Sequence, residues 1–505
     1  MLKKAIICSI LVMSLLSCST VSAATYTVND NMNNDFIQMM LGFMSTGDVL
    51  FFLDGIYTDI YLVVNKTINI TANPGGVIFQ GDYSYWNPGN NLTGLTINAD
   101  NVNISNINFT NYYNGILVNG SNNTEIKNTT ITDSNNGISI NNSNNTEIIN
   151  TNTNSGISVN NSDNTEISNT NITYAYNTNI SVENSNNTII TDTNITESYN
   201  SGISINNSNN TEIRNTNIVD SQNNGYYAIS VKESNNSYII NTTVSGDESI
   251  IDHRPIEIEG SENTHIENTY ISNIYSVFSI NIFNSNDTYV TNTYVSNSTV
   301  EGGLIGIQNS NGNYIINTFI SNTLVENPIR IYYSNNNYII NTTTINSTIY
   351  GEGGIIIYGG VNNFISNVLI KTQYNGIVIY DGTNTSISNV TIDRIPSEYN
   401  DELYYLISNG ISIFGSTDTT INSANINNFG QGINFGWENS NALISNSTIT
   451  NSNYGILIQP WNNQNIRIAN NLIANNYIGI LIQQASNVTM SSNTYYNNEE
   501  DIVIE

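Results

Sequence analysis

Short stretches of alternating apolar and polar residues recur along most of the chain. The phrase SNNTEIKNTTI at Ser121–Ile131 returns in altered form, for example as NNTEIRNTN from Asn209 and NNNYIINTT from Asn335. A second alternating stretch, such as GISI at Gly137–Ile140, comes about ten residues before the centre of each copy. The copies follow one another at intervals of about 22–27 residues, which is typical of solenoid repeats.

This pattern predicts strands. Side chains of a strand point alternately to its two faces, so the Ile residues face inward and the Ser and Asn residues outward. Asn, Thr and Ile are poor helix formers, and each period supplies two or three short strands separated by Asn, Ser and Gly turns. A single coil cannot bury its apolar face, but coils stacked about 4.8 Å apart can. We predict an all-β fold, a single parallel β-solenoid of about 17 coils, right-handed because parallel crossovers prefer that hand.

One position of the repeat is nearly always Asn. It lies two residues after the central apolar residue of each copy, and we expect its carboxamides to hydrogen-bond from coil to coil inside the rod. The residues of this asparagine ladder are Asn128, Asn150, Asn169, Asn215, Asn241, Asn268, Asn292, Asn317, Asn341, Asn367 and Asn389.

The residues before the repeats differ from them. Asn34–Met44 has apolar residues at helical spacing, which predicts a capping helix, and Val49–Leu53 alternates as a strand after Gly47-Asp48. With the turn Gly55-Ile56-Tyr57, this region resembles the amino-terminal cap of pectate-lyase-like right-handed β-helix proteins. The Asn- and Thr-rich composition resembles the adhesin-like surface proteins of methanogenic archaea. The resemblance implies a fold that hosts lyases, hydrolases and non-catalytic adhesins.

The chain accordingly divides into three predicted parts. Residues 1–23 are a signal peptide, residues 24–95 form the cap and the first coils, and residues 96–505 form the right-handed parallel β-helix repeats. Lys3 and Lys4 precede an apolar run, Ala5–Leu16, and a small-x-small sequence ends at Ala23, which together predict cleavage and secretion.

The alternative for this segment is lipidation at Cys18. Cys8 and Cys18 are the only two cysteines, so removal of the segment would leave no thiol chemistry. No later stretch is apolar for long enough to span a bilayer.

Charge narrows the range of partners. The net charge of -29, from 40 acidic and 11 basic residues, disfavours nucleic acids and anionic membranes, because both require basic patches. Only 10% of residues are charged, but the regular Ile positions argue for a packed core rather than disorder.

Two outward-facing columns are predicted from the aligned copies. The first changes from acidic to aromatic along the chain, through Glu125, Glu147, Glu166, Ile189, Glu212, Tyr238, His265, Tyr289, Tyr314, Tyr338 and Phe364. A flat row of carboxylates is a poor calcium site, because calcium prefers oxygen ligands from several directions. We therefore predict no cofactor, with Ca²⁺ as a weak alternative.

The second column changes from Asn to aromatic residues and supplies the predicted ligand-binding surface. Its residues are Arg330, Tyr332, Tyr358, Tyr380 and Phe414. The insert Arg394–Tyr405, in the longest interval between copies, is expected to overhang them. A row of aromatic rings with a nearby Arg suits an extended neutral glycan, and the alternative is a ladder of Tyr rings stacked only on one another.

Catalytic signals are sparse. The alternative site is an acidic and histidine cluster, consisting of Asp252, His253, Arg254, Glu257, Glu259 and His265. Glu257 and Glu259 alternate with Ile and are expected to face solvent as a pair, which can serve glycoside hydrolysis. The spacing matches no metal-ligand motif, and a lyase acting on polyuronates needs more basic residues than this chain has. No catalytic residue is assigned.

Together these features predict a secreted or cell-surface, adhesin-like protein that binds extracellular glycans or forms surface structure without catalysis. The alternative is a polysaccharide lyase or glycoside hydrolase on the same fold.

Overall fold

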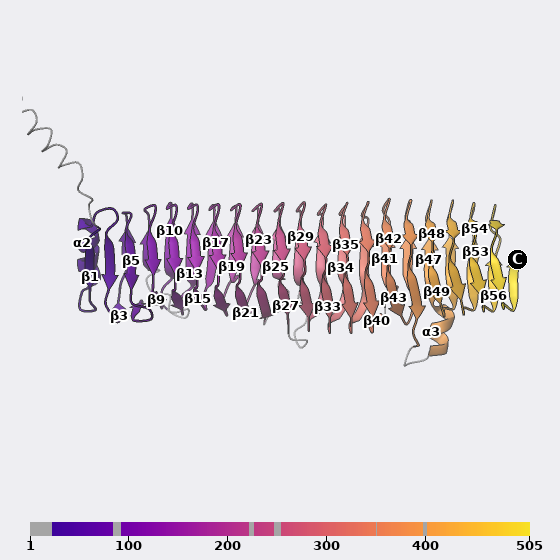
Figure 1. Ribbon diagram of the computed structural model, residues 1–505, viewed down its shortest axis with the longest axis horizontal. Coiled ribbons are helices and arrows are strands. Elements are labelled where there is room, and N and C mark those ends of the chain that lie inside the picture. Colours follow the sequence, from indigo (N-terminus) through magenta and orange to yellow (C-terminus); the bar gives the residue numbers. More distant parts are fainter. Residues whose placement is uncertain (1–22, 84–91, 222–226, 247–253, 350, 397–400) are drawn as a thin grey trace, which may run out of the picture.

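Three parallel sheets, here called A, B and C, run along the molecule. The computed structural model describes residues 23–83, 92–221, 227–246, 254–349, 351–396 and 401–505. Within these ranges the chain winds into a rod in which each coil adds one strand to each sheet (Figure 1). The predicted all-β, right-handed parallel solenoid is confirmed.

One coil illustrates the arrangement. Strand β13 (Asn136–Asn141) lies in sheet C, β14 (Glu147–Ile149) in sheet A and β15 (Asn152–Thr153) in sheet B, and the next strand, β16 (Gly156–Asn160), returns to sheet C. Each residue pairs with its counterpart one coil away, as Ile148 of β14 does with Ile126 of β11 (Glu125–Lys127). Both Ile side chains are fully buried, so the alternation of the sequence matches the inside and outside of the rod.

The middle and the carboxyl-terminal part of the rod contain the strands that carry the candidate functional residues. In sheet A they are β26 (Tyr238–Ile240), β29 (His265–Glu267), β32 (Tyr289–Thr291), β35 (Tyr314–Ile316) and β38 (Tyr338–Ile340). In sheet C they are β25 (Tyr227–Lys232), β28 (Arg254–Glu259), β31 (Tyr275–Phe283), β34 (Thr299–Gln308), β37 (Leu324–Tyr332), β41 (Ile355–Tyr358), β44 (Ile377–Tyr380), β47 (Asn409–Phe414), β50 (Gln431–Trp437) and β53 (Tyr454–Trp461).

A buried serine column closes the turn between sheets C and A. The backbone N–H of Ser143 donates to Oγ of Ser162 one coil further on, at 3.0 Å, and Ser185 donates to Ser208 in the same way at 2.9 Å. Each hydroxyl in turn donates to a carbonyl two residues earlier, as Ser143 does to Asn141 at 2.8 Å. Because both groups of each serine are satisfied, the turn can be polar and still lie in the interior.

The asparagine ladder lies on the outside of the rod, so its predicted inward placement is wrong. The eleven predicted residues turn the chain between sheets A and B with φ between 48° and 53°, and all are exposed except the half-buried Asn268. This left-handed conformation breaks the alternation of the strand, so the following Thr, such as Thr129 or Thr151, points inward instead. Asn tolerates the left-handed region better than other residues with a Cβ atom.

The exposed carboxamides still bond along the column. Asn150 Nδ2 donates to Asn128 Oδ1 at 3.2 Å, Asn317 to Asn292 at 3.0 Å and Asn341 to Asn317 at 3.1 Å. The ladder therefore combines two effects in one residue type, a tolerated backbone conformation and a hydrogen bond to the neighbouring coil.

The first coils lie before the repeats, within residues 24–95. Strands β1 (Thr25–Val28), β2 (Val49–Phe52), β3 (Gly55–Thr58) and β4 (Leu62–Val64) already belong to the three sheets, which gives about 19 turns rather than 17. The repeat missed them because their sequences lack the Asn-Thr phrase.

A capping helix, α2 (Asn34–Phe43), covers the first coil at one end of the rod (Figure 1). Asn33 caps its amino terminus by accepting a hydrogen bond from the N–H of Phe36 at 3.0 Å. The Gln38 carboxamide both donates to and accepts from the backbone of Val63, at 2.9 Å each way, and so occupies the free edge of β4. The helix thus prevents another strand from pairing at this edge.

The two contributions of a ladder residue can be separated at Asn292, which has a φ of 49° and bonds to the ladder on both sides. Asn292→Ala forces a Cβ residue without a local hydrogen bond into the left-handed region, and we expect it to lower stability by about 1–2 kcal/mol. Asn292→Gly loses the same bonds without that backbone strain, so we expect a smaller loss. Chemical denaturation of both variants measures the difference, and equal losses would contradict the proposed role of the left-handed turn.

Candidate functional site

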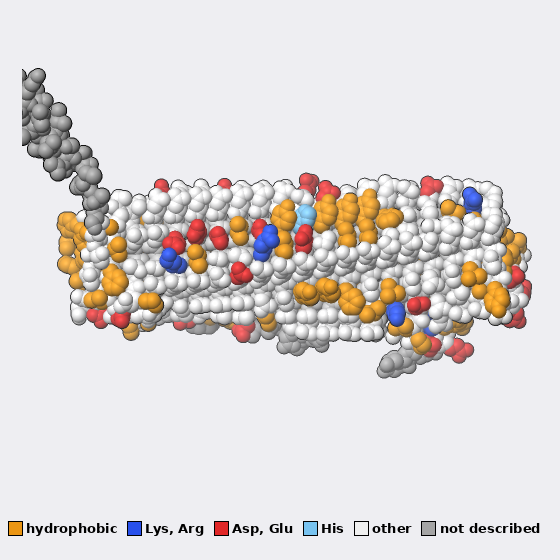
Figure 2. Space-filling view, viewed as in Figure 1, with side chains coloured by type: hydrophobic (Ala, Val, Ile, Leu, Met, Phe, Trp, Pro, Cys, Tyr) orange, Lys and Arg blue, Asp and Glu red, His pale blue; other side chains and the backbone are white. Residues whose placement is uncertain are grey.

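The predicted outward columns are continuous rows on the surface. Strand pairing joins Glu125 to Glu147 at one end of the sheet A column and Tyr338 to Phe364 at the other. In sheet C it joins Tyr332, Tyr358 and Tyr380 in the same manner. Figure 2 shows acidic side chains followed by aromatic ones along one row of the rod.

The aromatic part of the sheet A column is a closely stacked ladder that includes His265. The rings of Tyr238 and His265 lie 4.9 Å apart, and those of His265 and Tyr289 4.6 Å apart, with interplanar angles of 15° and 10°. His265 Nδ1 also lies 3.3 Å from a carboxylate oxygen of Glu267 on the same strand. His265 is therefore a ladder residue of sheet A, and the structure does not bring it together with Glu257 and Glu259 of sheet C.

The five residues of the predicted ligand-binding surface do lie together on sheet C. The rings of Tyr332 and Tyr358 are 4.5 Å apart, those of Tyr358 and Tyr380 4.8 Å, and those of Tyr380 and Phe414 4.9 Å. The Arg330 guanidinium lies over the Tyr332 ring at 4.4 Å, and it lies 3.8 Å from the Glu326 carboxylate. The sheet C ladder, as we call Tyr332, Tyr358, Tyr380 and Phe414, is thus capped at its first ring by Arg330.

The phenol groups of this ladder have an acidic neighbour. Glu352 accepts a hydrogen bond from the Tyr358 hydroxyl and lies beside Tyr380. Burial, assisted by the charge of Glu352, raises the pKa of Tyr380 to about 12 and that of Tyr358 further still. Both phenols therefore stay protonated at every physiological pH and act only as neutral hydrogen-bonding groups.

The ladder continues into a residue that the sequence analysis missed. The indole of Trp437 lies 4.5 Å from the Phe414 ring and 6.1 Å from Tyr380. It reaches that position because residue 436 is glycine, where a Cβ atom would lie 2.0 Å from Phe414 Cδ1. Trp437 is 46% exposed, and Trp461 on the next coil is 60% exposed. The sequence signal was available, since the chain has only three Trp and two of them end successive sheet C strands.

The described part of the insert does not overhang this ladder. It joins β46 (Thr391–Arg394) of sheet B to β47 of sheet C and contains the helix α3 (Asp401–Ile407), whereas the ladder residues stand at the opposite ends of the sheet C strands. Arg394 is buried, forms an ion pair with Asp401 and lies 5.4 Å over the ring of Tyr405. The predicted position is wrong because the insert occupies the turn before the strand rather than the turn after it.

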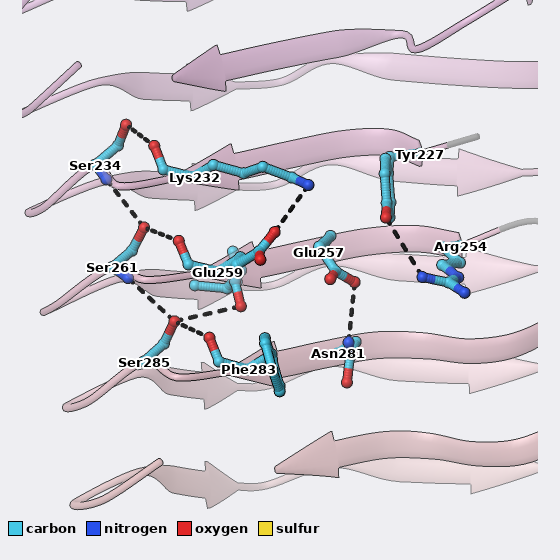
Figure 3. Close-up of polar contacts among 11 residues, drawn as sticks. Tyr227, Lys232, Ser234, Arg254, Glu257, Glu259, Ser261, Asn281, Phe283 and Ser285 are labelled. Atoms are coloured by element: carbon cyan, nitrogen blue, oxygen red, sulfur yellow. Dashed lines mark hydrogen bonds and ion pairs between the residues drawn. The ribbon is translucent and has the colours of Figure 1, made fainter. Parts of the chain in front are cut away.

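A second group of polar residues gathers near the middle of sheet C, on β25, β28 and β31 (Figure 3). Lys232 Nζ lies 2.8 Å from the Glu259 carboxylate, and Asn281 Nδ2 donates to Glu257 Oε2 at 3.0 Å. Arg254 donates to the Tyr227 hydroxyl at 3.4 Å. Of the alternative cluster, Arg254, Glu257 and Glu259 therefore lie together, while Asp252 and His253 fall outside the described residues.

Glu257 is buried, so the prediction that both carboxylates face solvent is wrong for this residue. It is 4% exposed because it lies in the middle of sheet C between Ser230 and Asn281 of the neighbouring coils. Burial raises the pKa of its carboxyl group, against the opposing effects of the Asn281 hydrogen bond and of Arg254 and Lys232. The two carboxylates are thus held in different environments, one buried and one paired with a lysine.

In the acidic row of sheet A, one carboxylate is paired with a lysine. Glu125 forms an ion pair with Lys127 at 2.9 Å, and a shallow hollow lined by Asn103, Asn145 and Glu147 lies beside it. Within the described ranges, no three His, Cys, Asp or Glu side chains are grouped so that they could bind a metal. In the same ranges no helix is long and apolar enough to cross a bilayer.

Comparison with known families agrees with the coil geometry. The family model described as a right handed beta helix region matches residues 155–324 and 375–505, more than half of the chain. The chain belongs to the right-handed β-helix family. The resemblance to pectate-lyase-like β-helix proteins is confirmed at the level of this fold. Among curated proteins, none matches this β-helix sequence.

Solved β-helix structures similar to this chain include an adhesin and enzymes. The surface adhesin PfbA of Streptococcus pneumoniae is 11% identical with a TM-score of 0.46, over 64% of this chain and 91% of that one. An alginate lyase from Paenibacillus sp. str. FPU-7 is 14% identical with a TM-score of 0.35, over 46% and 95%. The GH136 lacto-N-biosidase from Eubacterium ramulus is 10% identical with a TM-score of 0.40, over 63% and 67%. With identities of 10%, 11% and 14% and TM-scores of 0.46 or less, these likenesses indicate nothing about what this chain binds or does.

The buried carboxyl group predicts a pH-dependent effect of Glu257→Gln. Because the pKa of Glu257 is raised in the folded state from its ordinary value of 4.5, its contribution to stability is complete below pH 4.5 and is lost as pH rises through the folded pKa. The Gln side chain can keep the Asn281 hydrogen bond and is neutral at every pH. We expect the variant to melt at a higher temperature than the wild type at pH 7 and at a similar temperature at pH 4.

Thermal unfolding of the two proteins at both pH values is the measurement. Comparing the variant with the wild type at each pH removes the effect of the many other carboxylates. A lower melting temperature for Glu257→Gln at pH 7 would show that attraction to Arg254 and Lys232 outweighs the burial of the charge.

Proposed function

We propose that this β-helix is a secreted or cell-surface, non-catalytic protein that binds extracellular glycans through the aromatic face of sheet C. The face consists of Arg330, Tyr332, Tyr358, Tyr380 and Phe414. The observation that carries the proposal is the long aromatic row on the outside of the rod, in positions where the early coils have Asn. Large aromatic groups in a contiguous surface row are typical of interaction sites.

The chemistry of this face suits a neutral, hydroxyl-rich ligand. Its aromatic rings offer apolar edges, and the phenols of Tyr358 and Tyr380 stay neutral and can accept hydrogen bonds. The overall charge of -29 disfavours acidic polymers, which the chain would repel. Each contact is modest, so display of many copies at a surface would raise the avidity.

A catalytic alternative rests on a different place, the buried Glu257 beside Glu259. Two carboxylates in unlike environments can act as acid and base in glycoside hydrolysis. Here the Glu259 carboxylate forms an ion pair with Lys232 at 2.8 Å, and Asn281 holds Glu257. These contacts occupy both carboxylates, which favours the non-catalytic function.

Removal of one ladder ring tests the binding face. Tyr380 contacts Tyr358, Phe414 and Trp437, so Tyr380→Ala should disorder this part of the row. We expect binding to neutral polysaccharides to weaken at least about tenfold, which corresponds to about 1.4 kcal/mol. Affinity electrophoresis in gels containing cellulose derivatives, mannan, xylan or β-glucan gives the measurement.

Tyr314→Ala is the matched control. Tyr314 stacks between Tyr289 and Tyr338 at 4.8 and 4.7 Å, but on sheet A. It should lose similar stability and keep its glycan affinity. Equal binding by both variants and the wild type would contradict the assignment of the face, and release of reducing or unsaturated sugars, abolished by Glu257→Gln, would establish the enzymatic alternative.

A further inference from the structure

Trp437 and Trp461 depart from the rule that aromatic residues follow elsewhere on the rod. Aromatic residues at matching positions of neighbouring coils contact one another ring to ring, at 4.6–4.9 Å from Tyr238 to Tyr338 and at 4.5–4.9 Å along the sheet C ladder. Trp437 and Trp461 also pair in register, on β50 and β53. In the described part of the chain, however, no ring contact joins the two indoles.

Their backbones are nevertheless adjacent. The N–H of Gly415 donates to the Trp437 carbonyl at 2.7 Å, and the N–H of Glu438 donates to the Trp461 carbonyl at 2.6 Å. The indoles therefore diverge from neighbouring points of the main chain. Trp437 leans toward Phe414, and among the described aromatic residues Trp461 contacts none.

Extra residues at the end of each strand produce this divergence. In β47 a single residue, Phe414, separates inward Ile413 from the left-handed Gly415. The next coil has Gly436 and Trp437 before the left-handed Glu438, and the coil after it has Gln459, Pro460 and Trp461 before the left-handed Asn462. The strand register shifts between Phe435 and Trp437. Such bulges re-aim side chains, and here they leave Trp437 against Phe414 and carry Trp461 out of contact with the ladder.

The consequence for binding is that ring faces become available. Inside the sheet C ladder each ring covers the faces of its neighbours, so a ligand meets mainly ring edges and hydroxyls. At 46% and 60% exposure, Trp437 and Trp461 are the two most exposed aromatic side chains that continue this row. Gln459, two residues before Trp461, is half-buried and donates to the amide oxygen of the buried Asn434 at 3.0 Å, which leaves its own amide oxygen as an acceptor.

We propose that Trp437 and Trp461 form the stacking subsite of the glycan-binding face and hold consecutive pyranose rings of a neutral, extended polysaccharide. Pyranose rings have apolar C–H faces that pack on indoles and hydroxyl groups at their edges that bind amides. The two indoles lie on successive coils and diverge, so each can take a separate sugar ring. Exposed Glu438 beside the indoles disfavours acidic sugars. This inference rests on the proposed function and locates its strongest contact.

Tryptophan fluorescence tests the subsite directly. The protein is titrated with cellohexaose, mannohexaose, xylohexaose and laminarihexaose, and with hexagalacturonate as an acidic counterpart. We expect one or more neutral hexasaccharides to change the intensity or wavelength of the emission. Trp437→Ala and Trp461→Ala should each weaken binding about tenfold, measured by calorimetry, and Trp461→Phe should weaken it less because it keeps a smaller ring.

Tyr294→Ala, which removes a 42% exposed ring from the aromatic row of sheet B, is the control and should bind as the wild type does. Melting temperatures establish that each variant is folded. If the wild type binds none of the neutral sugars, the proposed function itself is wrong. If it binds them, is weakened by Tyr380→Ala and is unaffected by both Trp variants, the function stands and the Trp subsite is wrong. Tighter binding of hexagalacturonate than of any neutral sugar would overturn the ligand class.

Discussion

The parallel pairing of each coil with the next governs this structure. Apart from a few bulges, each strand repeats the register of its predecessor, so one residue choice is copied at strand spacing along the rod. Buried Ile columns build the core, buried Ser columns satisfy the turn between sheets C and A, and exposed Asn columns make the turn between sheets A and B. The same constraint turns surface residues into rows, which makes an isolated Tyr on one coil part of a ladder once its neighbours are aromatic.

The high Asn content of the chain follows from the backbone conformation of the turns between strands. Each coil turns several times through the left-handed region, and the residues that do so are overwhelmingly Asn. Asn reaches this region at low cost, and its carboxamide can also bond to the next coil. The abundance of Asn therefore reflects how the coils are joined and gives no indication of a ligand. The sequence's few charged residues fit the same picture, since uncharged columns avoid repulsion between like charges stacked on adjacent strands.

The repeat length and the alternation of apolar and polar residues made the surface columns predictable from the sequence. The predictions that were wrong failed for local physical reasons. The rows from Glu125 to Phe364 and from Tyr332 to Phe414 could be derived because the repeat fixes which residues are stacked. The side of the Asn ladder could not, because a left-handed residue breaks the two-residue period on which the inward assignment depended. The burial of Glu257 depends on Ser230 and Asn281, which lie more than twenty residues away in sequence. The bulges at Trp437 and Trp461 were not predicted from the sequence, because they lengthen the strand without disturbing its inward Ile residues.

Regular stacking and recognition compete for the same ring surface. In a perfect ladder such as Tyr289, Tyr314 and Tyr338, interplanar angles of 2° and 5° leave each ring covered on both sides, which stabilises the rod and leaves little aromatic face for a ligand. A ligand can stack only where the ladder ends or is interrupted. On sheet C the interruption is built from Gly436, which leaves room for Trp437 over Phe414, and from Gln459 and Pro460, which carry Trp461 beyond it. In a solenoid the irregular coil is therefore where binding is to be sought, because it is where stacking between coils leaves aromatic faces uncovered.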